Sequence, residues 1–263
     1  MLSDVTLGQY YPGDSTVHKM DPRMKIVLLI LFIVAVFLAR TLWAFIPVAA
    51  FVALAAAMSR VPGRVLLKGL RPLRFILILT FLMNVFFLQG ETVLFTWRFI
   101  RITREALTTA VLYALRLVLL VLGSSLLTLT TPPVTLTDGL ERILSPLRVI
   151  RFPAHEMAMM MTIALRFIPT LLEEADKIMK AQTARGADFE SGNLIARARA
   201  MVPLLVPLFV SAFRRAGDLA MAMEARCYHG GEGRTRLHVL KMAGRDYAAL
   251  AIGAALVALV AVL

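Results

Sequence analysis

Two short stretches of the same kind, Ala184-Arg185-Gly186 and Ala225-Arg226-Cys227, carry the residues best suited to bind another protein. Each places one arginine between small residues, and the two arginines lie 41 positions apart. A guanidinium group presents its donors in a planar fork and can bind a carboxylate through two parallel hydrogen bonds. Small neighbours would let the arginine and its backbone enter a groove. The pair therefore predicts two docking points for grooves that carry acidic side chains.

A capped and solvated helix end would by itself explain one such arginine. The helix dipole favours a cation in the last turn, and Gly186 suits the left-handed position that follows a helix. Exposed charges also seldom do anything specific. Since the arrangement occurs twice, a shared role in docking is the better interpretation of Arg185 and Arg226.

The first tripeptide closes a helical pattern that begins apolar and ends polar. Between His155 and Ala184, apolar or small residues recur with a 4-3-4-3 spacing, which predicts one continuous stripe along a helix. The members of the stripe are Met157, Met161, Ala164, Ile168, Leu171, Ala175 and Ile178. Such a helix is expected to start against the membrane and to leave it. Its methionines, Met160 included, favour adaptable packing against partners over a soft-metal site.

The second tripeptide closes a similar pattern, which runs from about Leu194 to Tyr228. Its block from Met201 to Phe213 has 13 residues that are apolar except for Ser211. At about 1.5 Å per residue the block covers roughly 20 Å, less than the roughly 30 Å of hydrocarbon in a bilayer. The block is therefore predicted to lie in or under the membrane, with the end of the helix in water.

The composition indicates an integral membrane protein, because 59% of the 263 residues are hydrophobic and only 17% are charged. The polar start of the chain does not resemble a cleavable signal peptide. A single cysteine, Cys227, is typical of a protein that faces a reducing cytosol. Five apolar runs could each cross a bilayer, some of them with snorkelling basic ends. They are Arg23 to Ala39, Leu42 to Met58, Arg74 to Leu88, Ala106 to Leu129 and Tyr247 to Leu263.

The predicted fold is an all-α integral membrane protein with about five transmembrane helices and a helical coupling domain. Residues 1–129 hold an N-terminal cytoplasmic segment and four spans, residues 130–246 form a cytoplasmic or interfacial domain, and residues 247–263 form the last span. Prolines are expected to divide the middle domain into short helices and kinks. They are Pro132, Pro133, Pro146, Pro153, Pro169, Pro203 and Pro207.

The distribution of basic residues predicts the orientation in the membrane. Of the 29 lysines and arginines, 24 lie on the side of the N-terminus and four lie on the other side. Arg116 lies inside the fourth span and is expected to hydrogen-bond to backbone or to polar groups of the bundle, for which Asn84 is a candidate. The positive-inside rule then places the N-terminus in the cytosol and the C-terminus outside. Trp43 and Trp97 fall near the expected interfaces.

Other kinds of function find less support. A phosphate-binding loop is absent from the sequence, so any ATP chemistry belongs to another chain. The four histidines are scattered, and neither a metal nor a cofactor is predicted. An intramembrane enzyme remains the first alternative, but its spans would need convergent polar residues, and Glu173-Glu174 lacks the arginine that prenyl-protein proteases place four residues later. A membrane-anchored basic protein that binds lipid or nucleic acid is the second alternative, although residues 130–246 hold 16 basic and 12 acidic residues.

The chain resembles the transmembrane T component of energy-coupling factor (ECF) transporters, which are ABC-type importers of vitamins and metals. The resemblance covers essentially the whole chain and is most specific at the two arginine tripeptides. The N-terminal block looks most like the shared type of T component. The matching stretches are Gly8 to Ser15, Asp21 to Arg23, Leu165 to Pro169, Ala181 to Phe189 and Met223 to Tyr228. Cys227 departs from the family, which often has glycine at that position.

The resemblance implies a scaffold that has no catalytic residues of its own. Its two coupling helices would end in Arg185 and Arg226, each docked in a groove of one of two cytosolic ATPase subunits. The apolar faces of these helices would hold a substrate-binding membrane subunit, the S component, with membrane lipid around the complex and no nucleic acid. Binding and hydrolysis of ATP would move the two tips and reorient the S component, so that it releases its vitamin inward. The residues expected to contact it are Met157, Met160, Met161, Ala164 and Ile168.

Overall fold

The structure is a computed structural model that describes residues 10–88, 92–97, 100–187, 189, 193–231 and 240–263. The chain divides into two compact units, each with its own packing. The bundle unit comprises Gly8–Ile143 and Val239–Leu263, and the two-helix unit comprises Met1–Leu7 and Leu144–His238. Residues 8, 9 and 188, which belong to the stretches that carry the resemblance, lie outside the described part of the chain. The domain boundaries at 129/130 and 246/247 stay a prediction.

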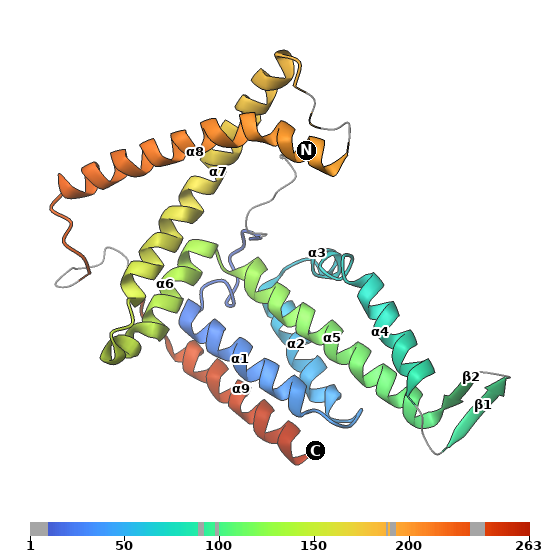
Figure 1. Ribbon diagram of the computed structural model, residues 1–263. Helices are drawn as coiled ribbons and strands as arrows, with labels where there is room; N and C mark the ends of the chain where they lie inside the picture. The colour runs from blue at the N-terminus through green and yellow to red at the C-terminus, as the bar shows by residue number, and fades with distance from the viewer. Residues whose placement is uncertain (1–9, 89–91, 98–99, 188, 190–192, 232–239) are drawn as a thin grey trace. The chain divides into compact units, whose positions relative to one another are not determined.

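The bundle unit consists of helices and one short hairpin (Figure 1). Its elements in chain order are α1 (Pro22–Leu38), α2 (Phe45–Ser59), α3 (Gly63–Lys68), α4 (Arg74–Phe87), β1 (Val93–Trp97), β2 (Ile100–Thr103), α5 (Arg104–Thr130), α6 (Pro133–Leu144) and α9 (Gly244–Val262). The antiparallel hairpin of β1 and β2 was not predicted, and the side chain of Trp97 lies outside what the structure describes. All five predicted spans are helices, namely α1, α2, α4, α5 and α9.

The apolar helices differ in length. Within the described residues, three helical segments are long and apolar enough to cross a membrane: α5, Arg197–Glu224 and α9. Helices α2 and α4 are apolar but shorter. Helix α1 has 17 residues, of which only Arg23 and Lys25 near its start are charged. The fold is that of an all-α membrane protein, as the composition predicts, with the hairpin as a small addition.

The core of the bundle unit forms where α1 packs against α2, α5 and α9. Ala35 and Val36 of α1 and Val48 of α2 have no exposed surface. Gly123 brings α5 close to α1, because a Cβ atom at this position would lie 2.3 Å from Cε1 of Phe32. Small residues that allow such close approach are the usual means by which membrane helices pack.

The two-helix unit contains the short 3₁₀ helix η2 (Ser145–Ile150) and two long helices, α7 (Ala154–Ala184) and α8 (Leu194–Glu224). Both long helices have 31 residues and are continuous through their internal prolines, Pro169 in α7 and Pro203 and Pro207 in α8. The expectation that these three prolines divide the segment into short helices is therefore wrong. A proline removes one backbone hydrogen bond, whereas ending a helix beside the membrane would leave several polar groups without partners.

Candidate docking site

Helix α7 ends in a cap that places Arg185 at the very tip. Gly186 has a φ angle of 90° and takes the left-handed conformation. The N–H of Ala187 donates to the carbonyl of Gln182 and that of Gly186 to the carbonyl of Thr183, both at 3.0 Å. This pair of bonds is the Schellman arrangement, which satisfies carbonyls that the helix leaves open. The side chain of Arg185 is exposed at the turn that the cap creates.

Helix α8 ends in the same cap, built from different residues. Cys227 has a φ angle of 56°, the N–H of Tyr228 donates to the carbonyl of Met223 at 3.0 Å, and that of Cys227 donates to the carbonyl of Glu224 at 2.9 Å. The helix thus ends at Glu224, a few residues before Tyr228, where the sequence pattern placed its end. Arg226 occupies the position that Arg185 occupies on α7, and it is also exposed. Each residue of this cap has a counterpart 41 positions earlier.

The two helices cross at an ion pair whose members are related by the same interval. Nη2 of Arg215 on α8 lies 2.8 Å from Oε2 of Glu174 on α7, and the two residues are 41 positions apart (Figure 1 shows the crossing). A hydrogen bond from Ser211, together with the charge of Arg215, lowers the pKa of the Glu174 carboxyl below its ordinary value. The pair therefore carries opposite charges at neutral pH.

The crossing is equally far from both arginine tips. Eleven positions separate Glu174 from Arg185, and eleven separate Arg215 from Arg226. At about 1.5 Å per residue, each arm is roughly 17 Å long. Neither arm contains a proline, so each continues the helix without a missing hydrogen bond. The unit therefore holds two arginines at the ends of two matched helical arms.

The two arms are held differently beyond the crossing. After α8 ends, Oη of Tyr228 lies 3.2 Å from Nε2 of His155, in the first turn of α7. A Cβ atom at Gly231 would lie 2.4 Å from Cδ2 of the same histidine, so the chain packs closely there. The segment that follows the Arg226 arm thus contacts His155 of α7 through two of its residues. At the other tip, Gly186 has open space around it.

The residues expected to contact a membrane partner form an exposed apolar surface along the first half of α7. Met157, Met160 and Met161 are 38%, 58% and 40% exposed, and Ala164 is exposed as well. Ile168 is only half-buried. We call these five residues the methionine surface. Exposed apolar surface of this kind marks contact with a protein or with lipid.

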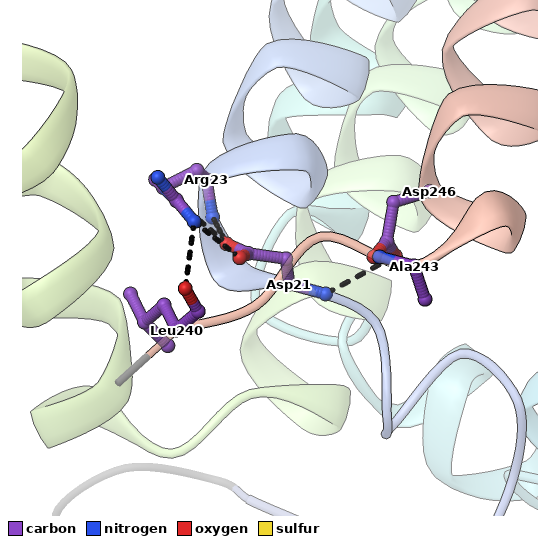
Figure 2. Close-up of polar contacts among 5 residues, drawn as sticks. All are labelled: Asp21, Arg23, Leu240, Ala243 and Asp246. Atoms are coloured by element: carbon purple, nitrogen blue, oxygen red, sulfur yellow. Dashed lines mark hydrogen bonds and ion pairs between the residues drawn. The ribbon is translucent and has the colours of Figure 1, made fainter. Parts of the chain in front are cut away.

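A polar network fixes the start of α1 beside the start of α9 (Figure 2). The carboxylate of Asp21 accepts hydrogen bonds from the backbone N–H of Arg23 and from its Nη2 atom, at 3.0 and 2.8 Å. Asp246 of α9 accepts from the backbone N–H of Asp21 at 3.3 Å and from that of Ala243 at 2.8 Å. Nη2 of Arg23 also donates to the carbonyl of Leu240. The Asp21-Pro22-Arg23 stretch therefore joins the starts of α1 and α9 through two aspartates, Asp21 and Asp246, that are 225 positions apart.

Asp246 was not singled out from the sequence, although a signal exists. It is the third residue of α9, where an acidic side chain often accepts the backbone N–H that precedes the helix. Asp246 has no exposed surface and Asp21 is 5% exposed. Burial raises the pKa of Asp21, but the hydrogen bonds and charge of Arg23 outweigh it, so that the pKa lies below its ordinary value.

Arg116 of α5 caps a helix end within the bundle. Its Nη2 atom donates to the carbonyl of Ala39 at 2.9 Å, just after α1 ends, and its guanidinium lies over the rings of Phe37 and Tyr113. The expected bond to backbone is confirmed, but the candidate partner Asn84 is wrong. Nδ2 of Asn84 donates to the carbonyl of Thr80 within α4.

Known proteins of one family are similar to this chain over most of its length. The family model CbiQ, described as cobalt transport protein, matches residues 13–237. The energy-coupling factor transporter transmembrane protein EcfT of Clostridium kluyveri is 53% identical over 250 residues, which cover 95% of this chain and 93% of that protein. The EcfT proteins of Acidaminococcus fermentans and Bacillus subtilis are 55% and 47% identical, over 91% and 94% of this chain and 89% and 93% of their own length.

Proposed function

Because the chain belongs to the family of ECF transporter transmembrane T components, we propose that it couples two cytosolic ATPase subunits to a substrate-binding membrane subunit. It is a transport component of the membrane. In this proposal the hydrolysis of ATP takes place on the partner subunits. The present chain converts their movement into reorientation of the S component, which takes up a vitamin or another micronutrient.

The matching hydrogen-bond patterns of the caps at the ends of α7 and α8 are the observation that carries the proposal. Each cap exposes one arginine between small residues and leaves its guanidinium accessible to a groove. Two ATPase subunits of the same kind present two similar grooves, so two similar tips are what such a pair would require. The small residues beside each arginine would keep the tip narrow enough to enter a groove of an ATPase subunit. They are Ala184, Gly186, Ala225 and Cys227.

The matched arms supply a route for the movement. When ATP draws the two ATPase subunits together, the docked tips at Arg185 and Arg226 would follow. Because the arms are rigid helices that cross at Glu174 and Arg215, movement of the tips changes the angle between α7 and α8. The methionine surface lies on the other side of the crossing along α7. An S component held there would be turned by the same change.

The proposed orientation follows from the docking role. The ATPase subunits are cytosolic, so both tips and the N-terminus would face the cytosol, and the C-terminus at the end of α9 would lie outside. The excess of basic residues in the short loops on the N-terminal side supports this arrangement.

Reversal of both tip charges tests the proposal. In the assembled transporter, Arg185→Glu combined with Arg226→Glu should abolish ATP-driven uptake. The ATPases should also dissociate from the double variant during purification, because like charges would meet in the acidic grooves. A buried charged contact costs on the order of 2 to 5 kcal/mol when one partner is lost. Arg214→Glu is the matched control, since Arg214 is an exposed arginine of α8 away from the tip. Normal uptake and copurification by the double variant would disprove the docking role.

A further inference from the structure

A cavity of about 320 Å³ lies within the bundle unit, where α1, α2, α5 and α9 come near the ends that bear Lys25, Met58, Thr130 and Arg245. The lining is almost wholly apolar and includes Phe32, Leu126 and Ala249, together with side chains of the segment that precedes α1. Few polar groups line the cavity to bind water, so water does not fill an apolar cavity of this kind favourably.

The cavity opens sideways between α2 and α9. At the far ends of these helices, Val48 and Val260 are buried in the common core. Toward the cavity, Leu54, Met58 and Ile252 line the space and are about half exposed, at 54%, 48% and 52%. The two helices therefore meet at one end and leave a gap at the other. In a bilayer, such a gap faces the hydrocarbon chains of the lipids.

Two positive charges stand at the polar end of the cavity. Nζ of Lys25 donates to the carbonyls of His18 and Thr130 and to Oγ1 of Thr131, at 3.0 to 3.2 Å. These acceptors are neutral, and no carboxylate among the described residues lies within 4 Å of this buried ammonium group. Arg245 is exposed, lines the cavity and donates to the carbonyl of Lys19.

The acidic side chains nearby cancel only part of this charge. Asp21 is paired with Arg23. The two backbone N–H groups bonded to the buried carboxylate of Asp246 are neutral, so this carboxylate offsets one of the two positive charges. A buried charge is normally balanced by a partner of opposite sign. The polar end of the cavity thus keeps a net positive charge, whereas the rest of the cavity is shaped for an apolar chain.

We propose that the cavity binds one anionic glycerophospholipid, with an acyl chain between α2 and α9 and the phosphate beside Arg245 and Lys25. A free phosphate ion would leave the apolar space empty. An uncharged apolar molecule would leave the excess positive charge unbalanced. A lipid supplies both parts, and basic residues at the membrane surface are the usual partners of anionic headgroups. The site is independent of the arginine tips, so it stands whether or not they dock ATPases.

Native mass spectrometry of the full chain in a non-ionic detergent tests the site. The chain is titrated with phosphatidylglycerol and with phosphatidylcholine that carry the same acyl chains. We expect one tightly bound phosphatidylglycerol, with an affinity about tenfold higher than that of phosphatidylcholine. Arg245→Gln should reduce this preference by about fivefold, the effect of one basic residue near an anionic headgroup. Equal affinity of the intact chain for the two lipids would overturn the proposal.

A variant that fills the cavity provides a second test of the site. Ala249→Trp puts a large ring into the cavity and should weaken binding of phosphatidylglycerol by about tenfold. Ala251→Trp is the matched control, because Ala251 is an exposed residue of the same helix that does not line the cavity. Should Ala249→Trp fail to fold, Ala55→Leu fills the cavity from α2. Unchanged binding by a folded cavity variant, or displacement of the lipid by inorganic phosphate alone, would also disprove the site.

Discussion

Cys227 takes the same left-handed backbone conformation at the end of α8 that Gly186 takes at the end of α7, with φ angles of 56° and 90°. Glycine adopts this conformation without penalty, whereas a residue with a Cβ atom pays a steric cost of about 1 to 2 kcal/mol. The cap of α8 is therefore the weaker of two caps that are otherwise alike. The departure of Cys227 from glycine leaves the geometry of the Arg226 tip unchanged.

We expect Cys227→Gly to stabilise the protein by about 1 kcal/mol, since it removes the steric cost and keeps both hydrogen bonds of the cap. Thermal unfolding in detergent measures the change. Ala220→Gly is the control, because it places glycine at an exposed position inside the same helix and should destabilise by about 1 kcal/mol. A lower melting temperature for both variants would show that the cap carries no strain.

Exchange of the two charges at the crossing should preserve the coupling that single reversals destroy. Glu174→Arg sets two arginines against each other, and Arg215→Glu sets two glutamates, so each single variant should lose ATP-driven uptake. The double variant restores an opposite pair at the same place and should recover it. Uptake by the assembled transporter is the measurement, with Glu173→Arg as a control at an exposed neighbouring site. Uptake that stays normal in both single variants would remove the crossing from the mechanism.

The methionine surface should contact the substrate-binding subunit. A photoreactive amino acid at Met160, which is 58% exposed, is expected to crosslink to that subunit in the assembled transporter. The same amino acid at Arg166, an exposed position six residues along α7, should crosslink to it much less. Gel analysis of the irradiated complex distinguishes the products. Crosslinks from Met160 to lipid alone would contradict the assignment of this surface.

The sequence predicted the long helices well because their periodic patterns are strong and local. Helix α7 runs from Ala154 to Ala184 against an expected His155 to Ala184, and α8 begins at Leu194 as expected. The pattern places the end of α8 near Tyr228, whereas the helix ends at Glu224, because nothing in the pattern marks Cys227 as left-handed. The internal prolines were misjudged, since a proline shows which bond is lost but not what the helix gains by continuing.

Contacts between distant elements could not be predicted in the same way. The bond from the N–H of Asp21 to Asp246 joins residues 225 positions apart, and periodicity carries no information on which helices become neighbours. The pair of Glu174 and Arg215 likewise depends on the rotation of two helices about their axes. The 41-residue interval was visible at the two tripeptides, and its extension to this pair became apparent only in the structure.

The link between Asp21 and Arg23 should make stability depend on pH in acid. The pKa of Asp21 is lower in the folded chain than its ordinary value near 4. The unfolded chain therefore binds the proton first as the pH falls, so the contribution of Asp21 is complete above the ordinary pKa and is lost as the pH falls through the folded pKa. Asp21→Asn should lower the melting temperature at pH 7, and its difference from the unchanged chain should shrink toward pH 3. Asp14→Asn is the control, because the side chain of Asp14 is 92% exposed. A difference for Asp21→Asn that is the same at both pH values would show that its ionised form does not stabilise the start of α1.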